Sequence, residues 1–254
     1  MTEVCLSNLV SRSKLYFRWL PVRDAVYFIV RDAFGLRCAR RCRVGDVSVY
    51  LRPCSTDILV AASCLGRREF DGVKASDVSV IVDAGAYVGY SAIYFSRRFP
   101  DAKVVAVEME PENYSLLVRN VSGYDNVMPV WGAVAARCGR KKIRFRSTGE
   151  WGYTIVDGEG GGRETGDEVR CETLDCLMRR MEIAEIDILK MDVEGAEREI
   201  LRAGGEWLRR TRVLIVELHD RIVAGCEDAF CDATRSWPRV ERVGEKVVAY
   251  RDKD

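Results

Sequence analysis

From residue 80 onward, short apolar runs alternate with segments of helical periodicity, and this alternation restricts the fold of the 254-residue chain more than any other feature. Such alternation predicts a parallel sheet with helices on both faces. Two further runs around Gly244 predict an antiparallel hairpin at the C-terminal end. The sequence therefore predicts an α/β, Rossmann-like fold with a seven-stranded, mostly parallel sheet. The predicted strands lie at 80–83, 103–108, 126–134, 186–192, 212–218, 239–243 and 246–251.

The remaining segments define helices, a loop and a domain boundary. Between the third and fourth strands, the glycine-rich stretch 158–166 predicts a mobile surface loop. A helix at 173–181 follows, with Thr173 as its N-cap. Residues 1–75 are predicted to form an N-terminal helical segment, and 76–254 the Rossmann-like domain. The other predicted helices lie at 90–99, 112–121, 195–203 and 220–234.

The N-terminal segment contains an amphipathic stretch at 16–34. Its apolar positions recur at helical spacing. We expect this stripe to pack on the domain, and peripheral membrane contact through 15–34 is the alternative. Charged residues interrupt every apolar run before it approaches about 20 residues, so no transmembrane segment is expected. The stripe consists of Trp19, Val22, Val26, Ile29 and Ala33.

Charge and cysteine spacing exclude several classes of protein. The formal net charge of +1 provides no overall field for nucleic acid, so no nucleic-acid partner is expected. The ten cysteines form no CxxC pair, which argues against a zinc site and favours free thiols. The first ten residues lack the basic start and apolar run of a secretory signal. A cytoplasmic location is therefore expected.

The turn after the first strand contains the best candidate for a cofactor site. It has the sequence DAGAYVG at 83–89, without the GxGxxG of dinucleotide-binding proteins. Asp83 at the strand end suits the ammonium group of a methionine moiety and would repel a pyrophosphate, which disfavours a NAD-dependent oxidoreductase. Glu108 ends the second strand, where an acid accepts both hydrogen bonds of a ribose diol. These acids, with Gly85 and Gly89, predict a site for S-adenosylmethionine.

The fourth and fifth strands end in the candidate catalytic residues. In LKMDVEG, the side chains of Lys190, Asp192 and Glu194 alternate onto one face of the strand. An alcohol needs a base or a metal to lose its proton, so Asp192 is a candidate base or metal ligand. Lys190 could stabilise an alkoxide, or form an ion pair with an acid. His219, the single histidine, is a second candidate base, and Glu217 could orient it.

The sequence assigns no metal-binding residues. Asp192, Glu194 and Asp220 carry oxygen ligands compatible with magnesium. Acids at the end of a strand are not a metal signature, so a divalent cation is possible but the sequence does not support one.

Several stretches resemble the FkbM-type methyltransferase family. They include VIVDAGAYVGYSAIYFSRRFP, VVAVEMEPENYSLL, IDILKMDVEGAEREIL, LIVELH and the upstream YLRPCSTDILVAAS, and together they cover roughly residues 46–220. The resemblance implies a class I methyltransferase fold, dependence on S-adenosylmethionine, and a hydroxyl acceptor on a sugar or natural product. Met109 and Tyr87 stand where the family often has proline and asparagine. By position, the cofactor-binding residues would be Asp83, Gly85, Gly89 and Glu108, with Thr56 and Asp57 at the methionine end, completed by Glu110 and Ala133.

Residues and resemblance together predict a methyltransferase that acts on a hydroxyl of a small molecule or glycan. A methyltransferase for RNA or protein is one alternative, since 14–43 is basic and contains aromatic residues. The lack of an Asn-Pro-Pro-Tyr-like motif opposes it. The other alternative is a protein that binds an adenosyl ligand without catalysis. Trp151 and Tyr153 are the candidate lid over the acceptor, and Tyr87 and Trp131 are further candidates for its pocket.

Overall fold

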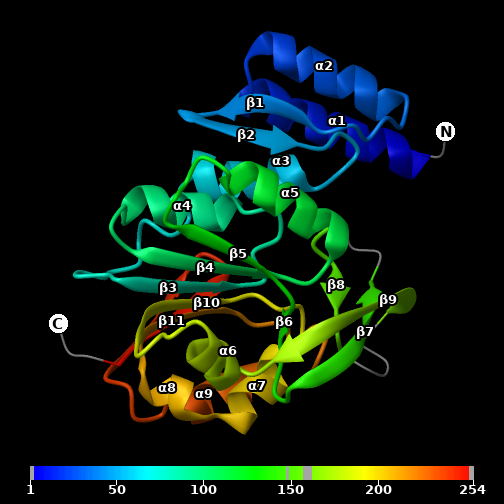
Figure 1. Cartoon of the computed structure of the whole chain (residues 1–254). Coiled ribbons are helices and arrows are strands. Elements are labelled where there is room, and N and C mark those ends of the chain that lie inside the picture. The colour runs from blue at the N-terminus through cyan, green and yellow to red at the C-terminus, as the bar shows by residue number, and fades with distance from the viewer. Residues whose placement is uncertain (1–2, 147–148, 157–161, 252–254) are drawn as a thin grey trace. The chain divides into compact units, whose positions relative to one another are not determined.

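The structure is a computed structural model that describes residues 3–146, 149–156 and 162–251 (Figure 1). Contacts divide the chain into two compact units, Met1–Phe70 and Asp71–Asp254. Among the described residues, no helix is both long and apolar enough to cross a membrane.

The N-terminal unit combines helices with a β-hairpin that the sequence did not predict. Pro21 divides the predicted helix 16–34, because proline has no amide hydrogen to donate within a helix. The hairpin lies in a stretch where Cys42, Val44, Val47 and Val49 alternate with exposed residues. The elements are α1 (Glu3–Trp19), α2 (Val22–Ala33), β1 (Arg40–Val44), β2 (Val47–Leu51), α3 (Asp57–Ala61) and the π-helical turn Ala62–Gly66.

The face of α2 that we expected to be buried is in fact exposed. Val22 and Val26 are 70% and 48% exposed, whereas Ala25, Phe28 and Asp32 are buried. A polar network explains the difference, and counting apolar positions could not reveal it. Its members are Tyr16, which stacks on Phe28 and donates to Asp32 at 3.1 Å, and Arg12, whose guanidinium lies 2.8 Å from the same carboxylate.

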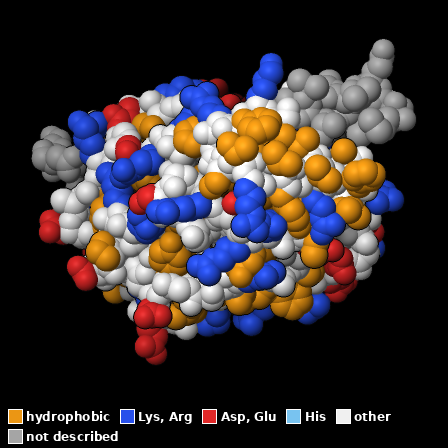
Figure 2. Space-filling model, turned by 90° about the horizontal axis from the view of Figure 1, so that it is seen from above, with side chains coloured by type: hydrophobic (Ala, Val, Ile, Leu, Met, Phe, Trp, Pro, Cys, Tyr) orange, Lys and Arg blue, Asp and Glu red, His pale blue; other side chains and the backbone are white. Residues whose placement is uncertain are grey.

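Exposed apolar side chains of this unit lie among basic ones. Figure 2 shows orange hydrophobic side chains interspersed with blue Lys and Arg side chains on one face of the molecule. Membrane contact through 15–34 stays a prediction, because exposure alone does not identify what covers such a surface. Among residues 11–36, the large hydrophobic side chains that are exposed are Phe17, Val22, Val26, Val30, Phe34 and Leu36.

The second unit has the predicted seven-stranded sheet. Its strand order is β12-β13-β11-β10-β3-β4-β5. The five strands from β11 to β5 pair in parallel, and β13 is antiparallel to its neighbours β11 and β12. This is the arrangement of a Rossmann-like class I methyltransferase sheet. The strands are β3 (Val80–Ala84), β4 (Lys103–Glu108), β5 (Val127–Trp131), β10 (Ile186–Met191), β11 (Thr211–Glu217), β12 (Arg239–Val243) and β13 (Lys246–Tyr250).

Helices cover both faces of this sheet, as Figure 1 shows. Helices α4 and α5 lie on one face, and α6 to α9 lie on the other. The Thr173 hydroxyl accepts from the Cys176 amide at 3.1 Å, which confirms the predicted N-cap of α6. The helices are α4 (Tyr90–Arg98), α5 (Pro111–Val121), α6 (Leu174–Arg180), α7 (Glu197–Ala203), α8 (Glu206–Arg209) and α9 (Cys226–Ala233).

A second, four-stranded sheet is inserted between β5 and α6. The glycine-rich stretch was predicted as a loop, but its residues 163–166 belong to β9; residues 157–161 lie outside the described part. Pairing with β7 holds this part of β9, and Lys142 and Arg144 form ion pairs with Glu164 at 2.8 and 2.9 Å. The strands are β6 (Ala133–Val134), β7 (Gly139–Phe145), β8 (Tyr153–Thr154) and β9 (Arg163–Glu172), in the order β6-β9-β7-β8.

The cysteines from Cys38 to Cys231 are free thiols. Two of them, Cys138 and Cys176, have their Sγ atoms 2.9 Å apart, with the guanidinium of Arg179 3.1 Å from the second. The hydrogen bonds from Cys138 and Thr173, together with this guanidinium, lower the pKa of the Cys176 thiol. Cys138 directly precedes β7 of the inserted sheet, and Cys176 belongs to α6.

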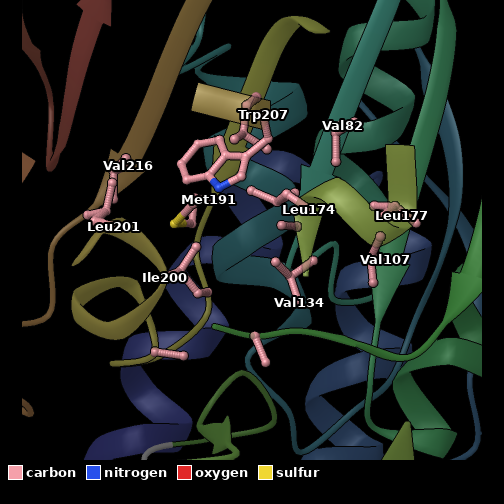
Figure 3. Close-up of a cluster of buried hydrophobic side chains, with 14 of the residues drawn as sticks. Val82, Val107, Val134, Leu174, Leu177, Met191, Ile200, Leu201, Trp207 and Val216 are labelled. Carbon is pink, nitrogen blue, oxygen red and sulfur yellow. The ribbon is translucent and has the colours of Figure 1, made fainter. Parts of the chain in front are cut away.

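One hydrophobic cluster fixes the main sheet against α6, α7 and α8. Figure 3 shows Trp207 of α8 among side chains from strands and helices, including Met191, Val216 and Leu174. Burial of such side chains stabilises the fold by about 1.5 to 3 kcal/mol each. The strand ends that carry the polar residues are therefore held by a packed core.

Candidate active site

The polar residues collect at the carboxyl ends of parallel strands. The register aligns Asp83 of β3 with Lys190 of β10 on one side and with Ala106 of β4 on the other. The chain turns from β3 towards β4 and later returns to β10, so the strand order reverses between β3 and β10. Ligands of α/β proteins bind at the carboxyl ends of strands at such a reversal.

Asp83 is completely buried, and the protein itself holds its carboxylate. Its Oδ2 accepts a hydrogen bond from the Ser91 hydroxyl at 2.6 Å, and Lys190 Nζ lies 3.1 Å from Oδ1. Burial raises the pKa of Asp83, and the Lys190 ammonium opposes that shift. The ion pair considered for Lys190 therefore exists. A contact of Asp83 with the cofactor stays a prediction.

Lys190 joins the two sides of the strand reversal. Its Nζ donates to the Gly85 carbonyl oxygen at 2.7 Å and lies 3.5 Å from Asp192 Oδ2, in addition to its contact with Asp83. The side chain is only 5% exposed. These contacts give Lys190 a positioning role and leave little of its ammonium for an acceptor.

The two predicted glycines allow the chain to pack closely on itself. Gly85 has φ +80°, and a Cβ there would lie 1.8 Å from the Asp192 carbonyl oxygen. Gly89 has φ +93°, and its Cβ would lie 2.7 Å from Leu117 Cδ1 of α5. A side chain at Gly85 would push the turn after β3 away from the end of β10. Both glycines are therefore required by the shape of the site, whether or not they also contact a ligand.

Glu108 is a buried acid oriented by two backbone amides. Its Oε2 accepts from Tyr87 N and its Oε1 accepts from Glu110 N, both at 2.9 Å. Burial raises the pKa of Glu108 to about 7, although the hydrogen bond from the Glu110 amide opposes that shift. The carboxylate keeps lone pairs on both oxygens, which suits the ribose-diol role predicted for it.

Trp131 lies beside this acid. It pairs with Glu108 across β4 and β5, it is 53% exposed, and its indole Nε1 donates to the Met109 carbonyl oxygen at 3.0 Å. The register places Trp131 next to the acid predicted to bind the ribose, and its place in the acceptor pocket stays a prediction. An exposed aromatic ring there offers a surface on which an adenine could stack.

The remaining predicted cofactor residues have local structural roles. The Glu110 carboxylate caps α5 by accepting from Asn113 N at 2.6 Å, and Ala133 is buried in β6. In the N-terminal unit, Asp57 is buried and its Oδ1 lies 2.8 Å from Arg52 Nη2. Thr56 precedes α3. Their contacts with a cofactor stay predictions.

Asp192 and Glu194 converge on His219. The imidazole is 1% exposed, and its Nε2 lies 3.9 Å from Asp192 Oδ1 and 3.8 Å from Glu194 Oε1. We call these three residues the strand-end cluster. Glu217 Oε1 lies 3.6 Å from the same nitrogen, but among the described residues only the strand-end cluster has one ligand atom from each member within 4.8 Å of the others.

Sequence reasoning missed Glu197, which holds this region together. It is fully buried at the start of α7, and its Oε1 lies 2.9 Å from His219 Nδ1. It also accepts from Val193 N at 2.9 Å and from Gly195 N at 2.8 Å. The sequence does place an acid after a glycine in the first turn of a helix, which could have marked Glu197. Its contact with His219, 22 residues further along the chain, could not be inferred from the sequence.

The carboxylates change the proton affinity of His219. Burial acts to lower its pKa, but the contacts with Glu197 and Glu217 outweigh burial and raise the pKa to about 11. In the protein alone, the imidazole is therefore cationic near neutral pH, and in that state it cannot accept a proton. Burial raises the pKa of Glu194 to about 7, against the effect of His219. A catalytic role for His219 stays a prediction, and these contacts oppose the role of a free base.

Asp192, Glu194 and Glu217 each have a cation beside the carboxylate oxygen that faces away from His219, which we call the outer oxygen. Arg146 Nη1, from the end of β7, lies 3.4 Å from Glu194 Oε2, and Lys246 Nζ lies 3.4 Å from Glu217 Oε2. Lys190 takes the equivalent place at Asp192 Oδ2. Each acid thus has one oxygen beside a cation and the other directed at His219.

Asp220 does not belong to the cluster, although it was grouped with Asp192 and Glu194 on sequence. Its two carboxylate oxygens accept from Gly225 N at 3.0 Å and from Glu227 N at 2.9 Å. Asp220 therefore organises the turn before α9.

The predicted lid is attached to α5. The Asn113 side chain donates to the Glu150 carbonyl oxygen at 2.9 Å, directly before Trp151. The Tyr153 ring packs on Phe145 with their centroids 5.0 Å apart. These contacts place the segment at the inserted sheet, and its function as a lid stays a prediction.

Known proteins of similar sequence include two methyltransferases and a synthetase. Methyltransferase sdnD of Sordaria araneosa is 30% identical over 196 residues, which are 61% of this chain and 74% of that protein. Methyltransferase 1 of Beauveria bassiana is 25% identical over 157 residues, 52% of this chain and 61% of that protein. The antimetabolite synthetase AmbE of Pseudomonas aeruginosa is 26% identical over 204 residues, 65% of this chain but 10% of that protein.

A solved structure of the FkbM methyltransferase from Methylobacillus flagellatus KT aligns with 96% of this chain and 59% of its own, at 12% identity and a TM-score of 0.47. The model of the methyltransferase FkbM domain matches residues 83–237. That match covers more than half of the chain and includes Asp83, Glu108 and the strand-end cluster. The chain therefore belongs to the FkbM methyltransferase family and is an S-adenosylmethionine-dependent methyltransferase.

Proposed function

We propose that this enzyme transfers the methyl group of S-adenosylmethionine to a hydroxyl oxygen of a small molecule or sugar. The observation that carries the proposal is the strand-end cluster beside the reversal of strand order. Lys190 connects Asp83 and Gly85, on the cofactor side, with Asp192 of this cluster. Groups that can take a proton from an acceptor thus lie directly next to the predicted cofactor site.

The residues of the first two strand ends fit the cofactor. Glu108 has two oxygens fixed by amides and would accept the ribose hydroxyls, while Trp131 offers an exposed ring on the same side. The turn that Gly85 makes possible would pass along the methionine portion. When bound, S-adenosylmethionine supplies a methyl group that is already activated by its sulfonium.

The chain must then orient the acceptor and remove its proton. An alcohol is a weak nucleophile until its proton leaves, and positioned acid–base groups typically contribute about 10²- to 10⁴-fold to a rate. The side chains of Asp192 and Glu194 are 26% and 13% exposed, whereas those of Lys190 and His219 are 5% and 1% exposed. Asp192 and Glu194 are therefore the members that would meet an acceptor. Lys190 and His219 are more buried and would position the two acids.

The names of the relatives support a small acceptor. Two are named only as methyltransferases, and the third is named an antimetabolite synthetase. An antimetabolite is a small molecule, so an enzyme of this kind fits a small-molecule acceptor better than a polymer.

The test is methyl transfer from isotope-labelled S-adenosylmethionine to separate small-molecule, glycan, RNA and protein fractions of a cell extract. We expect label in a small-molecule or glycan product, with nuclear magnetic resonance identifying a methoxy carbon. Asp192→Asn should abolish the labelling, and Asp220→Asn, an acid outside the cluster, should keep it. Label in RNA or protein, or on nitrogen or carbon, would contradict the proposal.

A further inference from the structure

The strand-end cluster contains a buried nitrogen without a hydrogen-bond partner. His219 Nδ1 faces a carboxylate oxygen of Glu197, which accepts, so Nδ1 carries a hydrogen. Nε2 on the other side of the ring has no hydrogen-bond partner, and three carboxylate oxygens lie 3.6 to 3.9 Å from it. A buried polar atom left in this way costs stability unless something occupies the space in front of it.

The three side chains of the cluster are already oriented from behind. Lys190 lies beside the outer oxygen of Asp192, Arg146 lies beside the outer oxygen of Glu194, and Glu197 holds Nδ1 of His219. Metal-binding histidines almost always have their second ring nitrogen held by a carboxylate, a backbone carbonyl or water, and ligating carboxylates are likewise supported. The inner atoms, Oδ1, Oε1 and Nε2, are directed at one another.

The separations between these inner atoms fit an ion between them. Two ligand atoms bonded at about 2.2 Å lie about 3.1 Å apart at a right angle and about 3.8 Å apart at 120°. Nε2 lies 3.9 Å from Asp192 Oδ1 and 3.8 Å from Glu194 Oε1. These spacings are too long for hydrogen bonds and are close to those of ligands around a common cation.

Charge points to the same occupant. The contacts described above join the carboxylates of Asp83, Asp192, Glu194, Glu197 and Glu217 with the cations of Lys190, Arg146 and Lys246. With the acids ionised and His219 protonated, as in the protein alone, this network carries one more negative than positive charge. A divalent cation that replaces the proton on Nε2 would bring the sum to zero.

We propose that Asp192, Glu194 and His219 bind one divalent metal ion through Oδ1, Oε1 and Nε2. Two carboxylates favour a hard ion such as Mg²⁺ or Mn²⁺, and an imidazole favours a transition metal, so Mn²⁺ matches the mixed set best. Asp192 keeps part of its surface exposed, so substrate or water can complete the coordination.

Such an ion would explain how a buried, carboxylate-rich cluster activates an acceptor. A hydroxyl bound to a divalent cation loses its proton to solvent more easily, because the ion stabilises the oxygen anion. This role rests on the proposed transfer to oxygen. Metal binding itself does not, and it can be measured without any acceptor.

The experiment titrates metal-free full-length protein with Mn²⁺ alone and follows the electron paramagnetic resonance signal of the free ion together with calorimetry. We expect one bound Mn²⁺ per chain. Asp192→Asn and Glu194→Gln should each weaken binding by more than about tenfold, because each removes the charge of one ligand. The matched control Asp220→Asn removes an acid from the turn before α9 and should bind Mn²⁺ like the parent chain.

Ligation by the histidine has its own readout. Pulsed electron paramagnetic resonance of the Mn²⁺ complex should show coupling to one nitrogen nucleus, and this coupling should be absent in His219→Gln. If that variant does not fold, the nitrogen coupling in the parent protein and the Asp192→Asn titration still decide the matter. Absence of Mn²⁺ binding, or equal binding by Asp192→Asn, would overturn the metal site and leave a proton on Nε2 as the occupant. A failed search for a methoxy product with intact Mn²⁺ binding would overturn only the proposed acceptor.

Discussion

The ends of β3 and β4 differ from the ends of β10 and β11 in how their acids are held. Around the first pair, the Ser91 hydroxyl donates a hydrogen bond to Asp83, Lys190 forms an ion pair with it, and two backbone amides donate to Glu108. Around the second pair, Asp192, Glu194 and Glu217 face a histidine nitrogen beyond hydrogen-bonding distance. In the first pair the acids have close partners from the protein, whereas in the second pair three acids surround a nitrogen that has no hydrogen bond.

The proposed function gives each of these two halves its own task. A site that must bind the same cofactor in every cycle gains from rigid, satisfied groups, because their order is fixed before binding. A site that must move a proton needs groups whose partner changes during the reaction. Gly85 and Lys190 connect the two halves, so each half can be disturbed separately or both together.

The largest expected effect separates catalysis from cofactor binding. Asp192→Asn keeps the shape of the side chain but removes a charge from the acceptor half, so methyl transfer should fall about 10³-fold or more. Affinity for S-adenosylhomocysteine should change by less than about threefold, because Glu108 and Trp131 are untouched. Turnover and calorimetric affinity are the two measurements. A parallel loss of both would show that the halves are not independent.

The next effect concerns the contact between the halves. Gly85→Ala places a Cβ 1.8 Å from the Asp192 carbonyl oxygen at a left-handed φ, so the free energy of unfolding should fall by more than about 3 kcal/mol. Gly244→Ala is the matched control, since its φ is also positive but no atom lies within 4 Å. It should lose only about 1 to 2 kcal/mol. Urea denaturation measures both, and equal losses would mean that the close approach is unimportant.

A smaller effect is expected in the cofactor half alone. Glu108→Gln removes a charged acceptor of hydrogen bonds worth about 1.5 to 3 kcal/mol, so the affinity for S-adenosylhomocysteine should fall about 10- to 100-fold. Mn²⁺ binding should be unchanged, because Glu108 is not part of the strand-end cluster. Calorimetry with each ligand tests this, and an altered affinity for Mn²⁺ would break the proposed separation.

The smallest effect is a pH dependence of cofactor affinity. The pKa of Glu108 is raised to about 7 by burial, and only the carboxylate can accept from both ribose hydroxyls. Affinity for S-adenosylhomocysteine should therefore rise by up to about tenfold as the pH increases from about 6 to 8, and fall in the opposite direction. In Glu108→Gln the profile should be flat. A parent profile as flat as that of the variant would show that Glu108 does not titrate in this range.

Much of the second unit could be predicted from the sequence. The strands of the main sheet alternate with helices, and the pattern of buried apolar residues defines both. The motif around Asp83 and Glu108 is also local, because a strand, a turn and the next strand bring these residues together within a short stretch of chain. Their meeting at one edge follows from parallel strands alone.

Three features could not be predicted because they depend on contacts between distant segments. The inserted sheet contains β9, which begins with exposed residues and is held by pairing with β7. The face of α2 that is buried depends on Asp32, whose carboxylate contacts Tyr16 and Arg12 of α1. Glu197 contacts His219 and Arg146 contacts Glu194 only in the folded chain, and neither residue belongs to a sequence pattern that would reveal these contacts.

The sequence by itself determined the alternation of strands and helices and the acids that end β3, β4 and β10, because apolar periodicity and strand-end position are local properties. Tertiary structure decided what those acids do. It buried Asp83 against Lys190, gave Glu108 two amide donors, and left His219 Nε2 facing Asp192 and Glu194 without a hydrogen bond. Burial and the separation between charges set the chemistry of a carboxylate, and both arise only when the strands pack side by side.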